Sequence, residues 1–445
     1  MLYNFVELNR NDRTALCVQL YEGLRKGIES GRLGPGEHLL SIRQASLELG
    51  LSRTTVENAY QRLTLEGYAE ARPQSGYRVR AVIPRRRKAN VLQAEEPDYD
   101  FTTHGTDPDE ADMENWKKLL RRVLTDVKAV STYGDPQGEP ELREALSSYS
   151  FRARGVSADP SMIFIGAGTG PLLQLLCPLL DRNMPVIMEE PGFPLLDRIF
   201  SDYGFSIRMV PSEGSYPEEG MCMLASLPSM RKKRPADESA QDRKELLSWL
   251  EGGPERYLLE DDYNGELRDR TRPLSSCQSL SPGKTIYIGS FSKLLLPSVR
   301  AAYMVLPEEL AGKARRRLIT FNQTAGKTEQ LALAEYISSG LLEKHLRRLR
   351  RLYSKKSWTM ENALSGVFGR RCSYELLETS LAFSVSFDTS LSADLMVSLA
   401  GKAGIAVRKA PGTGDGKPRL LIGFSSVRED GIEEGMKALS KAWNM

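Results

Sequence analysis

Lys293 has neighbours that could make its side-chain amine chemically reactive. It follows the apolar stretch 285–289 and stands in a short turn with Ser290 and Ser292, and Arg300 comes seven positions later. Two hydroxyls, an amine and a guanidinium in one turn suit a ligand that carries both a phosphate ester and a carbonyl. An amine forms a Schiff base only when deprotonated, and neighbouring cations lower a lysine pKa. Taken alone, so short a motif is more simply a surface lysine, because Ser-x-Lys recurs by chance.

An acidic cluster about thirty residues upstream supplies a possible partner. The apolar stretch 256–259 ends in Glu260, Asp261, Asp262 and Tyr263. Adjacent carboxylates repel one another, so we expect a cation opposite them, and a protonated pyridine nitrogen would serve. The phenol of Tyr263 could then reach a ring oxygen beside that nitrogen. The alternative is a solvated acidic loop.

Strand, carboxylate and tyrosine, followed by strand, serine and lysine, resemble the cofactor site of fold-type I pyridoxal 5'-phosphate enzymes, the aspartate aminotransferase group. The resemblance predicts an α/β domain with a largely parallel sheet. The chain from residue 101 onward alternates short apolar strands with helical patterns, as that fold requires.

Other turns in this region could hold a ligand. Gly168, Thr169 and Gly170 follow an apolar strand and open a helix, where free backbone amides face a phosphate. Phe193 stands in a tight turn and could lie on a flat ring, although core packing explains it equally well. Tyr133 begins a turn rich in glycine and proline.

The first 82 residues have a different pattern, of short helices followed by a hairpin. Helices are predicted over 15–30, 41–49 and 53–66, and two short strands flank a turn at 73–76. Ser52 is the expected N-cap of the third helix. This order describes a helix-turn-helix with a wing, in which the third helix presents its first residues to base edges.

The stretch GRLGPGEHLLSIRQASLELGLSRTTVENAYQRLTLEGY and the hairpin after it resemble the GntR-type winged-helix domain. Leu40 departs from the family, which usually has proline there. The resemblance implies double-stranded DNA as partner, and the residues that would face it are Arg43, Ser52, Arg53, Thr54 and Thr55, with Arg78 on the wing. The alternative is a three-helix capping subdomain of an enzyme.

Composition sets the outer limits. The chain has 445 residues, 40% of them hydrophobic, and a net charge of +3, so any nucleic-acid contact has to come from local patches. Its five cysteines show no paired spacing, and its three histidines lie too far apart in sequence to suggest a metal site. With no signal-peptide pattern and no long apolar segment, we expect a cytoplasmic protein. We expect a winged-helix domain over 1–82, a linker over 83–99 and an aminotransferase-like domain over 100–445, with a basic run at 84–88 that could add phosphate contacts.

Taken in order, these motifs resemble the MocR-type regulators, in which a GntR-type domain is fused to an aminotransferase-like domain. The motifs are YGDPQGEPELR, GAGTGPLLQLL, EEPGFP, EDDYNGEL, SFSKLLLPSVR, EKHLRRLRRLY and RLLIGFSSV. By that match Lys293 is the Schiff-base lysine, Asp261 pairs with the pyridine nitrogen and Tyr263 with the ring oxygen. The match also implies that Phe193 stacks on the ring, that Tyr133 reaches the phosphate of a partner subunit in a homodimer, and that Arg419 holds an effector's α-carboxylate. The phosphate would be held by Gly168, Thr169, Gly170, Ser290, Ser292 and Arg300.

Two departures weaken the case for an active transaminase. The polar loop that the family usually carries is replaced at 227–235 by LPSMRKKRP, and Leu195 and Leu196 stand where some relatives have a second arginine. We therefore expect a DNA-binding regulator that senses an amino acid or amine through an external aldimine. The alternative is a working aminotransferase with an accessory N-terminal domain, because fold alone does not decide between them.

Overall fold

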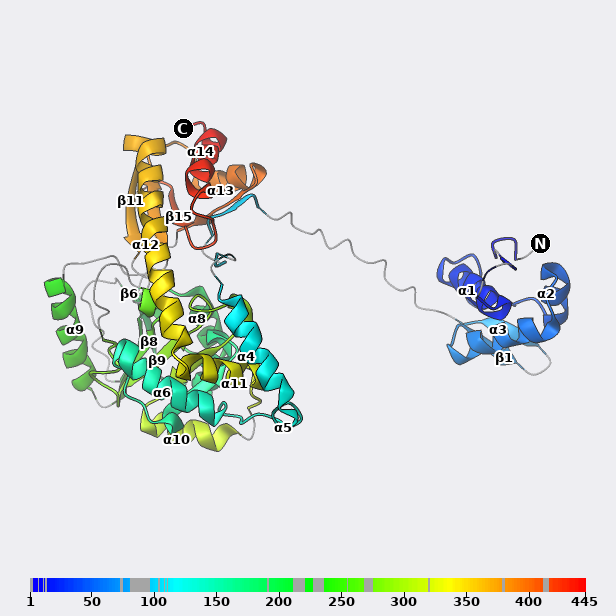
Figure 1. Ribbon diagram of the computed structural model, residues 1–445, viewed down its shortest axis with the longest axis horizontal. Helices are drawn as coiled ribbons and strands as arrows, with labels where there is room; N and C mark the ends of the chain where they lie inside the picture. The colour runs from blue at the N-terminus through cyan, green and yellow to red at the C-terminus, as the bar shows by residue number, and fades with distance from the viewer. Residues whose placement is uncertain are drawn as a thin grey trace. The chain divides into compact units, whose positions relative to one another are not determined.

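The chain forms two compact units, Met1–Glu95 and Glu96–Met445, and each is described by itself (Figure 1). The basic run at 84–88, most of the predicted linker and the loop 227–235 lie outside the described residues. The computed structural model describes residues 3–6, 8–10, 12, 14–72, 75–80, 97–102, 105–107, 109, 111–189, 192–210, 221–226, 236–253, 255–267, 275–318, 321–377, 381–410 and 416–445.

The N-terminal unit is a winged helix-turn-helix, as predicted. Its helices are α1 (Leu16–Glu29), α2 (Ile42–Leu49) and α3 (Arg53–Leu65), and the wing is the antiparallel pair β1 (Ala69–Arg72) and β2 (Gly76–Val79). Fifteen buried apolar side chains from the helices, the wing and the N-terminal segment form its core. An apolar cluster of that extent lets the unit hold its shape with its own contacts.

Local signals fix both ends of α2. The Ser41 hydroxyl accepts from the backbone N–H of Gln44 at 3.2 Å, and the Gln44 amide oxygen accepts in return from the Ser41 N–H, which completes a capping box at the start of α2. Gly50 ends α2 in the left-handed conformation at φ 64°, which glycine adopts without strain. The turn between α2 and α3 is therefore set by the sequence itself.

Leu40, the departure from the GntR pattern, has a structural reason in this chain. Its backbone N–H donates to the Tyr3 hydroxyl at 3.0 Å, and its carbonyl accepts from the Tyr60 hydroxyl at 2.9 Å. The two buried phenols also contact each other at 2.7 Å. Proline has no N–H, so it could not complete this network.

The second unit is built on a seven-stranded sheet in the order β4-β10-β9-β8-β7-β5-β6. Only β10 runs antiparallel to its neighbours, and the others are parallel. The strands are β4 (Ile163–Gly166), β5 (Val186–Glu189), β6 (Ile207–Val210), β7 (Met221–Ser226), β8 (Glu255–Asp261), β9 (Thr285–Ser290) and β10 (Ala302–Val305).

Helices cover both faces of this sheet, so successive strand residues enter different cores. On β9, Tyr287 packs in one core while Ile286 and Ile288 pack in the other. This near-continuous burial is why the strands read as apolar runs in the sequence. The helices are α4 (Met113–Thr125), α5 (Val127–Val130), α6 (Pro140–Arg154), α7 (Thr169–Leu176), α8 (Pro194–Asp202), α9 (Ala236–Glu251), α10 (Glu308–Arg317) and α11 (Lys327–Ser338).

A long helix, α12 (Leu341–Phe368), runs from the large sheet region to a smaller C-terminal layer (Figure 1). The four-stranded sheet of that layer has the order β11-β12-β15-β14, and α13 (Ala393–Lys402) and α14 (Gly431–Trp443) complete it. Its strands are β11 (Cys372–Leu377), β12 (Ala382–Phe387), β14 (Arg408–Lys409) and β15 (Arg419–Gly423), and β3 (Tyr99–Asp100) pairs in parallel with β13 (Ile405–Ala406).

All five cysteines are free thiols, as their spacing predicted. Among the described residues, no helix combines the length and the apolar character needed to cross a membrane.

Candidate functional site

Lys293 is a buried amine in the turn after β9. The residue is 3% exposed, and its Nζ donates to the Ser425 hydroxyl at 3.0 Å and to the Gly105 carbonyl. Burial lowers the pKa of Lys293 to about 8, against the Asp100 carboxylate, which raises it. The amine is thus more readily deprotonated than an ordinary lysine, as attack on a carbonyl requires. The expected cause was neighbouring cations, but removal from water is the larger one.

Asp261 ends β8, the strand beside β9, and pairs in register with Ile288. Its Oδ1 is buried and has no hydrogen-bond partner among the described residues. Burial, and next to it the Asp262 charge, raise the pKa of Asp261 to about 7. A buried carboxylate without a partner is costly, so this oxygen fits a ligand that brings a cationic N–H. The protonated ring nitrogen of pyridoxal 5'-phosphate has that chemistry.

Tyr263 lies two residues beyond Asp261 and is half-buried. Burial raises the pKa of its phenol to about 12, so it stays a neutral donor at ordinary pH. The next residue, Asn264, has φ 61°, in the left-handed region that L residues other than glycine seldom adopt. Asparagine adopts this region more often than most L residues, so it suits the turn that follows β8.

The third carboxylate of the acidic cluster does not face a ligand. Asp262 is bound by the Arg154 guanidinium at 2.5 and 3.1 Å and by the Tyr287 hydroxyl at 2.9 Å. Glu260 accepts the backbone N–H groups of Cys277 and Gln278 at 2.9 and 3.1 Å. The expected opposing cation is therefore Arg154 for Asp262, and the interpretation as a solvated acidic loop is wrong because these groups are buried.

A cradle for an anion forms where β4 and β9 end and the antiparallel strand β10 begins between them. Ala302 pairs with Gly166 on one side and with Ser290 on the other, so α7 and the Ser290–Arg300 turn start from neighbouring strand ends. Gly168 is the N-cap of α7, and a Cβ there would lie 2.6 Å from the Arg300 guanidinium. A larger residue there would displace the guanidinium, and the backbone φ of 95° also favours glycine.

The charges of this cradle call for an anion. Thr169 and Gly170 occupy the first turn of α7, whose N–H groups have no partner within the helix. Arg300 has φ 49° and places its guanidinium beside this positive helix end, donating to the Ala167 carbonyl at 3.4 Å. Ser290 donates its hydroxyl to Ser292 at 3.2 Å nearby. A cation at a helix N-terminus is unfavourable unless an anion lies between them, as a phosphate would.

Phe193 and Tyr133, two residues predicted to contact the ligand, differ in how far they are buried. Phe193 is partly buried against the core that includes α7 and α8, so stacking on a ring stays a prediction. Tyr133 is 102% exposed. A side chain this exposed makes no contact with the site of its own chain, which suits a residue that acts across a subunit interface.

Arg419 and Lys293 are separated along the small sheet. Arg419 begins β15, which ends at Gly423 before the chain reaches Ser425 and the Lys293 amine. Four residues of extended strand span about 13 Å. Between them, on the same face, Leu421 packs with Leu377 and Ala382, and Arg419 donates to the Ser386 hydroxyl at 3.1 Å. The role of Arg419 as the arginine that binds the effector's carboxylate stays a prediction.

Sequence reasoning missed a second lysine that stabilises the same region. Lys356 of α12 is fully buried, and its Nζ donates to Asp107 Oδ2 and to the Val427 carbonyl, both at 2.6 Å. Asp107 and Val427 lie two residues beyond Gly105 and Ser425, the partners of Lys293. A lone buried lysine in a run of basic residues gave no signal of this. The sequence around Lys356 does not distinguish it from the solvated basic residues of the same helix.

The N-terminal residues predicted to face DNA fall into two groups. Arg43, Arg53 and Thr54 are exposed near the starts of α2 and α3, where a base edge could reach them. Ser52 caps α3 by accepting from the Thr55 N–H at 3.1 Å, and its hydroxyl contacts the Thr55 hydroxyl at 2.7 Å. These two side chains therefore hold the helix start as well as lining it.

Arg78 on β2 has an internal role. Its Nε donates to the Gly36 carbonyl at 2.5 Å, and its backbone bridges to His38. The predicted tip of the wing at 73–74 lies outside the described residues. Arg78 thus ties the wing to the turn before α2, and a DNA contact by this residue remains a prediction.

Comparison with known families divides the chain in the same order. Residues 16–79 match "Bacterial regulatory proteins, gntR family", and residues 101–222 match "Aminotransferase class I and II". The HTH-type transcriptional regulator YhdI of Bacillus subtilis is 32% identical over 463 aligned residues, which cover 98% of this chain and 97% of YhdI. The probable rhizopine catabolism regulatory protein MocR of Rhizobium meliloti is 30% identical, covering 78% of this chain and 77% of MocR.

The solved structures that resemble the second unit are aminotransferases. The kynurenine aminotransferase of Pyrococcus horikoshii superposes with a TM-score of 0.68 at 22% identity, covering 79% of this chain and 92% of that enzyme. This likeness establishes a fold-type I aminotransferase fold.

Proposed function

This chain belongs to the MocR-type HTH transcriptional regulators, in which a GntR-type winged helix precedes an aminotransferase-like domain, and we propose that it senses an amino acid or amine with pyridoxal 5'-phosphate. In this proposal the ligand displaces Lys293 by forming an external aldimine, and the DNA affinity of the protein changes in consequence. The chain would act in the cytoplasm, where its DNA is. Residues 1–82, 83–99 and 100–445 would serve as DNA reader, tether and sensor.

The proposal rests on two residues that follow or end neighbouring strands, Lys293 and Asp261, because the pKa values of both are shifted toward neutrality. Burial brings the Lys293 amine to a pKa of about 8 and raises the pKa of the Asp261 carboxyl to about 7, and the buried Oδ1 of Asp261 has no hydrogen-bond partner among the described residues. Groups moved toward neutrality in this way are typical of functional sites. The residues fit pyridoxal 5'-phosphate, which supplies an aldehyde for amines and a ring that withdraws electrons. Lys293 would hold the aldehyde, Asp261 the ring nitrogen and Tyr263 the ring oxygen.

The cradle around Arg300 supports the same cofactor. The first turn of α7 and the Ser290 and Ser292 hydroxyls offer donors to a phosphate, and Gly168 leaves space for the guanidinium. A phosphate here would neutralise the cation at the helix N-terminus.

We further propose a homodimer that presents two winged helices to repeated operator sites. Tyr133 is fully exposed, and the same stretch exposes the apolar side chains Leu124, Val127 and Val130. Apolar groups gathered on a surface favour a protein partner, and a second copy would bring Tyr133 to its phosphate. Two-fold symmetry of the protein then requires a repeated DNA site.

The position of Arg419 bears on the effector. If this arginine binds the effector's α-carboxylate, as the family resemblance implies, the effector is an amino acid whose amino group reacts at Lys293. A simple amine would leave Arg419 unused.

The test uses the full chain loaded with cofactor. We expect a visible absorption band that shifts on addition of one member of a panel of amino acids, D-amino acids and amines. A Lys293→Ala protein should lose the borohydride-reducible lysine adduct and the effector response, yet bind operator DNA as before. Arg419→Ala should respond only at higher effector concentration. A full effector response in Lys293→Ala would rule out aldimine exchange as the switch.

Measuring turnover distinguishes the proposed regulator from the alternative function, a working aminotransferase. A regulator should release at most one equivalent of keto acid per site, whereas an enzyme should release many. Multiple turnovers without any operator binding would overturn the proposal.

A further inference from the structure

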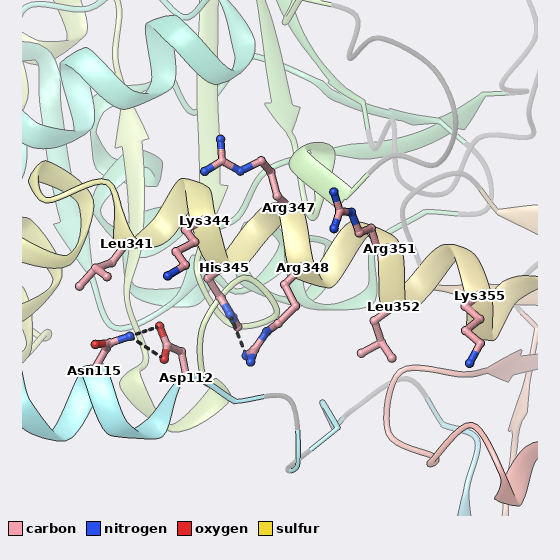
Figure 2. A pocket seen from close by; sticks show the side chains of 10 residues that line it. All are labelled: Asp112, Asn115, Leu341, Lys344, His345, Arg347, Arg348, Arg351, Leu352 and Lys355. Atoms are coloured by element: carbon pink, nitrogen blue, oxygen red, sulfur yellow. Dashed lines mark hydrogen bonds between the residues drawn. The ribbon is translucent and has the colours of Figure 1, made fainter.

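A second pocket opens in the aminotransferase-like unit, between the start of α4 and the first half of α12. Its cavity volume is about 710 Å³, within the range of small-molecule sites. Figure 2 shows side chains from both helices around it, with Asp112 and Asn115 on the α4 side. It does not include Lys293, Asp261 or Arg300, so it is separate from the site already described.

The α12 side of the pocket is a row of cations. Lys344, Arg348, Arg351 and Lys355 follow one another at spacings of four, three and four residues, so they share one helix face, and Arg347 lies beside them. All five are exposed, while Asp112 is the one carboxylate among the lining residues. Like charges this close repel one another, and an anion in the pocket would relieve that repulsion.

Part of this charge has a partner among the described residues. Lys355 pairs with Glu429 at 2.9 Å, and Arg348 contacts the His345 ring at 3.3 Å. Across the described residues, Lys344, Arg347 and Arg351 form no ion pair. Exposed arginines elsewhere in the same unit do pair, as Arg152 does with Glu343 at 2.9 Å.

A buried histidine beside the cations lacks a partner on one side. His345 is 4% exposed and lines the pocket, and its Nε2 is buried with no hydrogen-bond partner in the part of the chain that the structure describes. Burial lowers the pKa of His345 to about 4, so the ring is neutral. A buried polar nitrogen of this kind is costly unless a ligand or water meets it.

The opposite wall is polar and preorganised. Asp112 accepts from the Tyr336 hydroxyl at 2.7 Å and from the Asn115 side-chain amide at 3.0 and 3.1 Å. These contacts fix the carboxylate, whose remaining acceptor capacity suits a hydroxyl or N–H of a ligand. The pocket thus offers cations on one side and a hydroxyl-binding group on the other.

We propose that this pocket binds a small molecule carrying two or more phosphate groups together with hydroxyl groups, such as a nucleoside polyphosphate. The arginines would take the phosphates as paired donors, and Asp112 the hydroxyls. DNA is the competing source of phosphate, but a duplex whose major groove alone is about 12 Å wide could contact only the rim of so small a cavity. The proposal stands apart from amine sensing at Lys293.

The test is calorimetric titration of the cofactor-loaded full chain with ADP and with inorganic tripolyphosphate at fixed ionic strength. We expect saturable binding of one probe molecule per chain. Arg347→Ala/Arg351→Ala should weaken both probes by roughly tenfold or more, since it removes charged donors. Arg347→Lys/Arg351→Lys should recover part of the loss. The matched control, Arg182→Ala/Arg370→Ala, removes the same charge from exposed positions outside the pocket and should bind like the parent.

Two results would overturn the proposal. Equal weakening in the control pair would mean that general charge attracts the probes. If the pocket variant kept probe binding but lost operator affinity with a shallower salt dependence, the cations would belong to DNA phosphates. Circular dichroism of each variant verifies folding.

Discussion

Asp261 and Asp262 are neighbours at the end of one strand, are both buried, and have opposite surroundings. Asp262 is bound on both oxygens by Arg154 and again by Tyr287. Asp261 has an oxygen with no partner among the described residues, and its pKa is raised to about 7. Side chains alternate along a strand, so Asp262 faces Arg154 of α6 and Asp261 faces the other side of the sheet.

The difference separates structural from functional charge. A buried charged group whose hydrogen bonds are all made within the chain stabilises the fold. A buried charged group whose hydrogen bonds are incomplete is available to bind a ligand. The same distinction holds in the winged helix, where Arg78 donates to Gly36 and Arg53 is exposed at the start of α3. Three substitutions test it, in order of decreasing effect.

Removing Arg154 should have the largest effect. Arg154→Ala leaves the Asp262 charge buried and unpaired, which costs about 3–5 kcal/mol of unfolding free energy. The measurement is urea unfolding of the aminotransferase-like unit within the full chain. Arg152→Ala is the matched control, because it breaks an exposed ion pair with Glu343 and should cost at most about 1 kcal/mol. Equal losses of unfolding free energy in the two variants would contradict the structural role of the Arg154–Asp262 pair.

Asp261→Asn should stabilise the cofactor-free chain while weakening cofactor binding. The folded pKa of about 7 lies above the ordinary aspartate value of 3.8, so the folded state holds the proton more tightly and loses stability as pH rises from 4 to 7. Asparagine removes this dependence, so the gain should be greatest at pH 8, up to about 4 kcal/mol for a shift from 3.8 to 7, and vanish near pH 4. Thermal unfolding at both pH values measures it. A gain independent of pH would show that Asp261 is already satisfied.

Arg53→Ala should leave stability unchanged and weaken operator binding by about 1–3 kcal/mol if the side chain reads a guanine edge. A phosphate contact would instead weaken all sequences alike. Arg78→Ala sharpens the contrast, since it should lower the melting temperature of the N-terminal unit through loss of the Gly36 contact. Gel-shift titrations with operator and scrambled DNA, paired with thermal unfolding, separate the two roles.

The sequence predicted the fold well because its signals are local. The Ser41 and Ser52 caps, the glycine at 50 and the alternating apolar runs define helices and strands without reference to distant residues. Lys293 and Asp261 were found for the same reason, as each follows an apolar strand. The partners of charged groups could not be predicted, because Arg154 lies over a hundred residues before Asp262 and Gly105 and Ser425 meet Lys293 from opposite ends of the domain.

Lys293 and Lys356 each join the same two chain segments by hydrogen bonds. Lys293 bonds to Gly105 and Ser425, and Lys356 bonds to Asp107 and Val427, two residues further along each segment. When the Lys293 amine bonds elsewhere, Lys356 still joins the two segments, and the Ser425 hydroxyl still donates directly to the Gly105 carbonyl at 2.9 Å. The contact between the segments therefore does not depend on the amine that is expected to react.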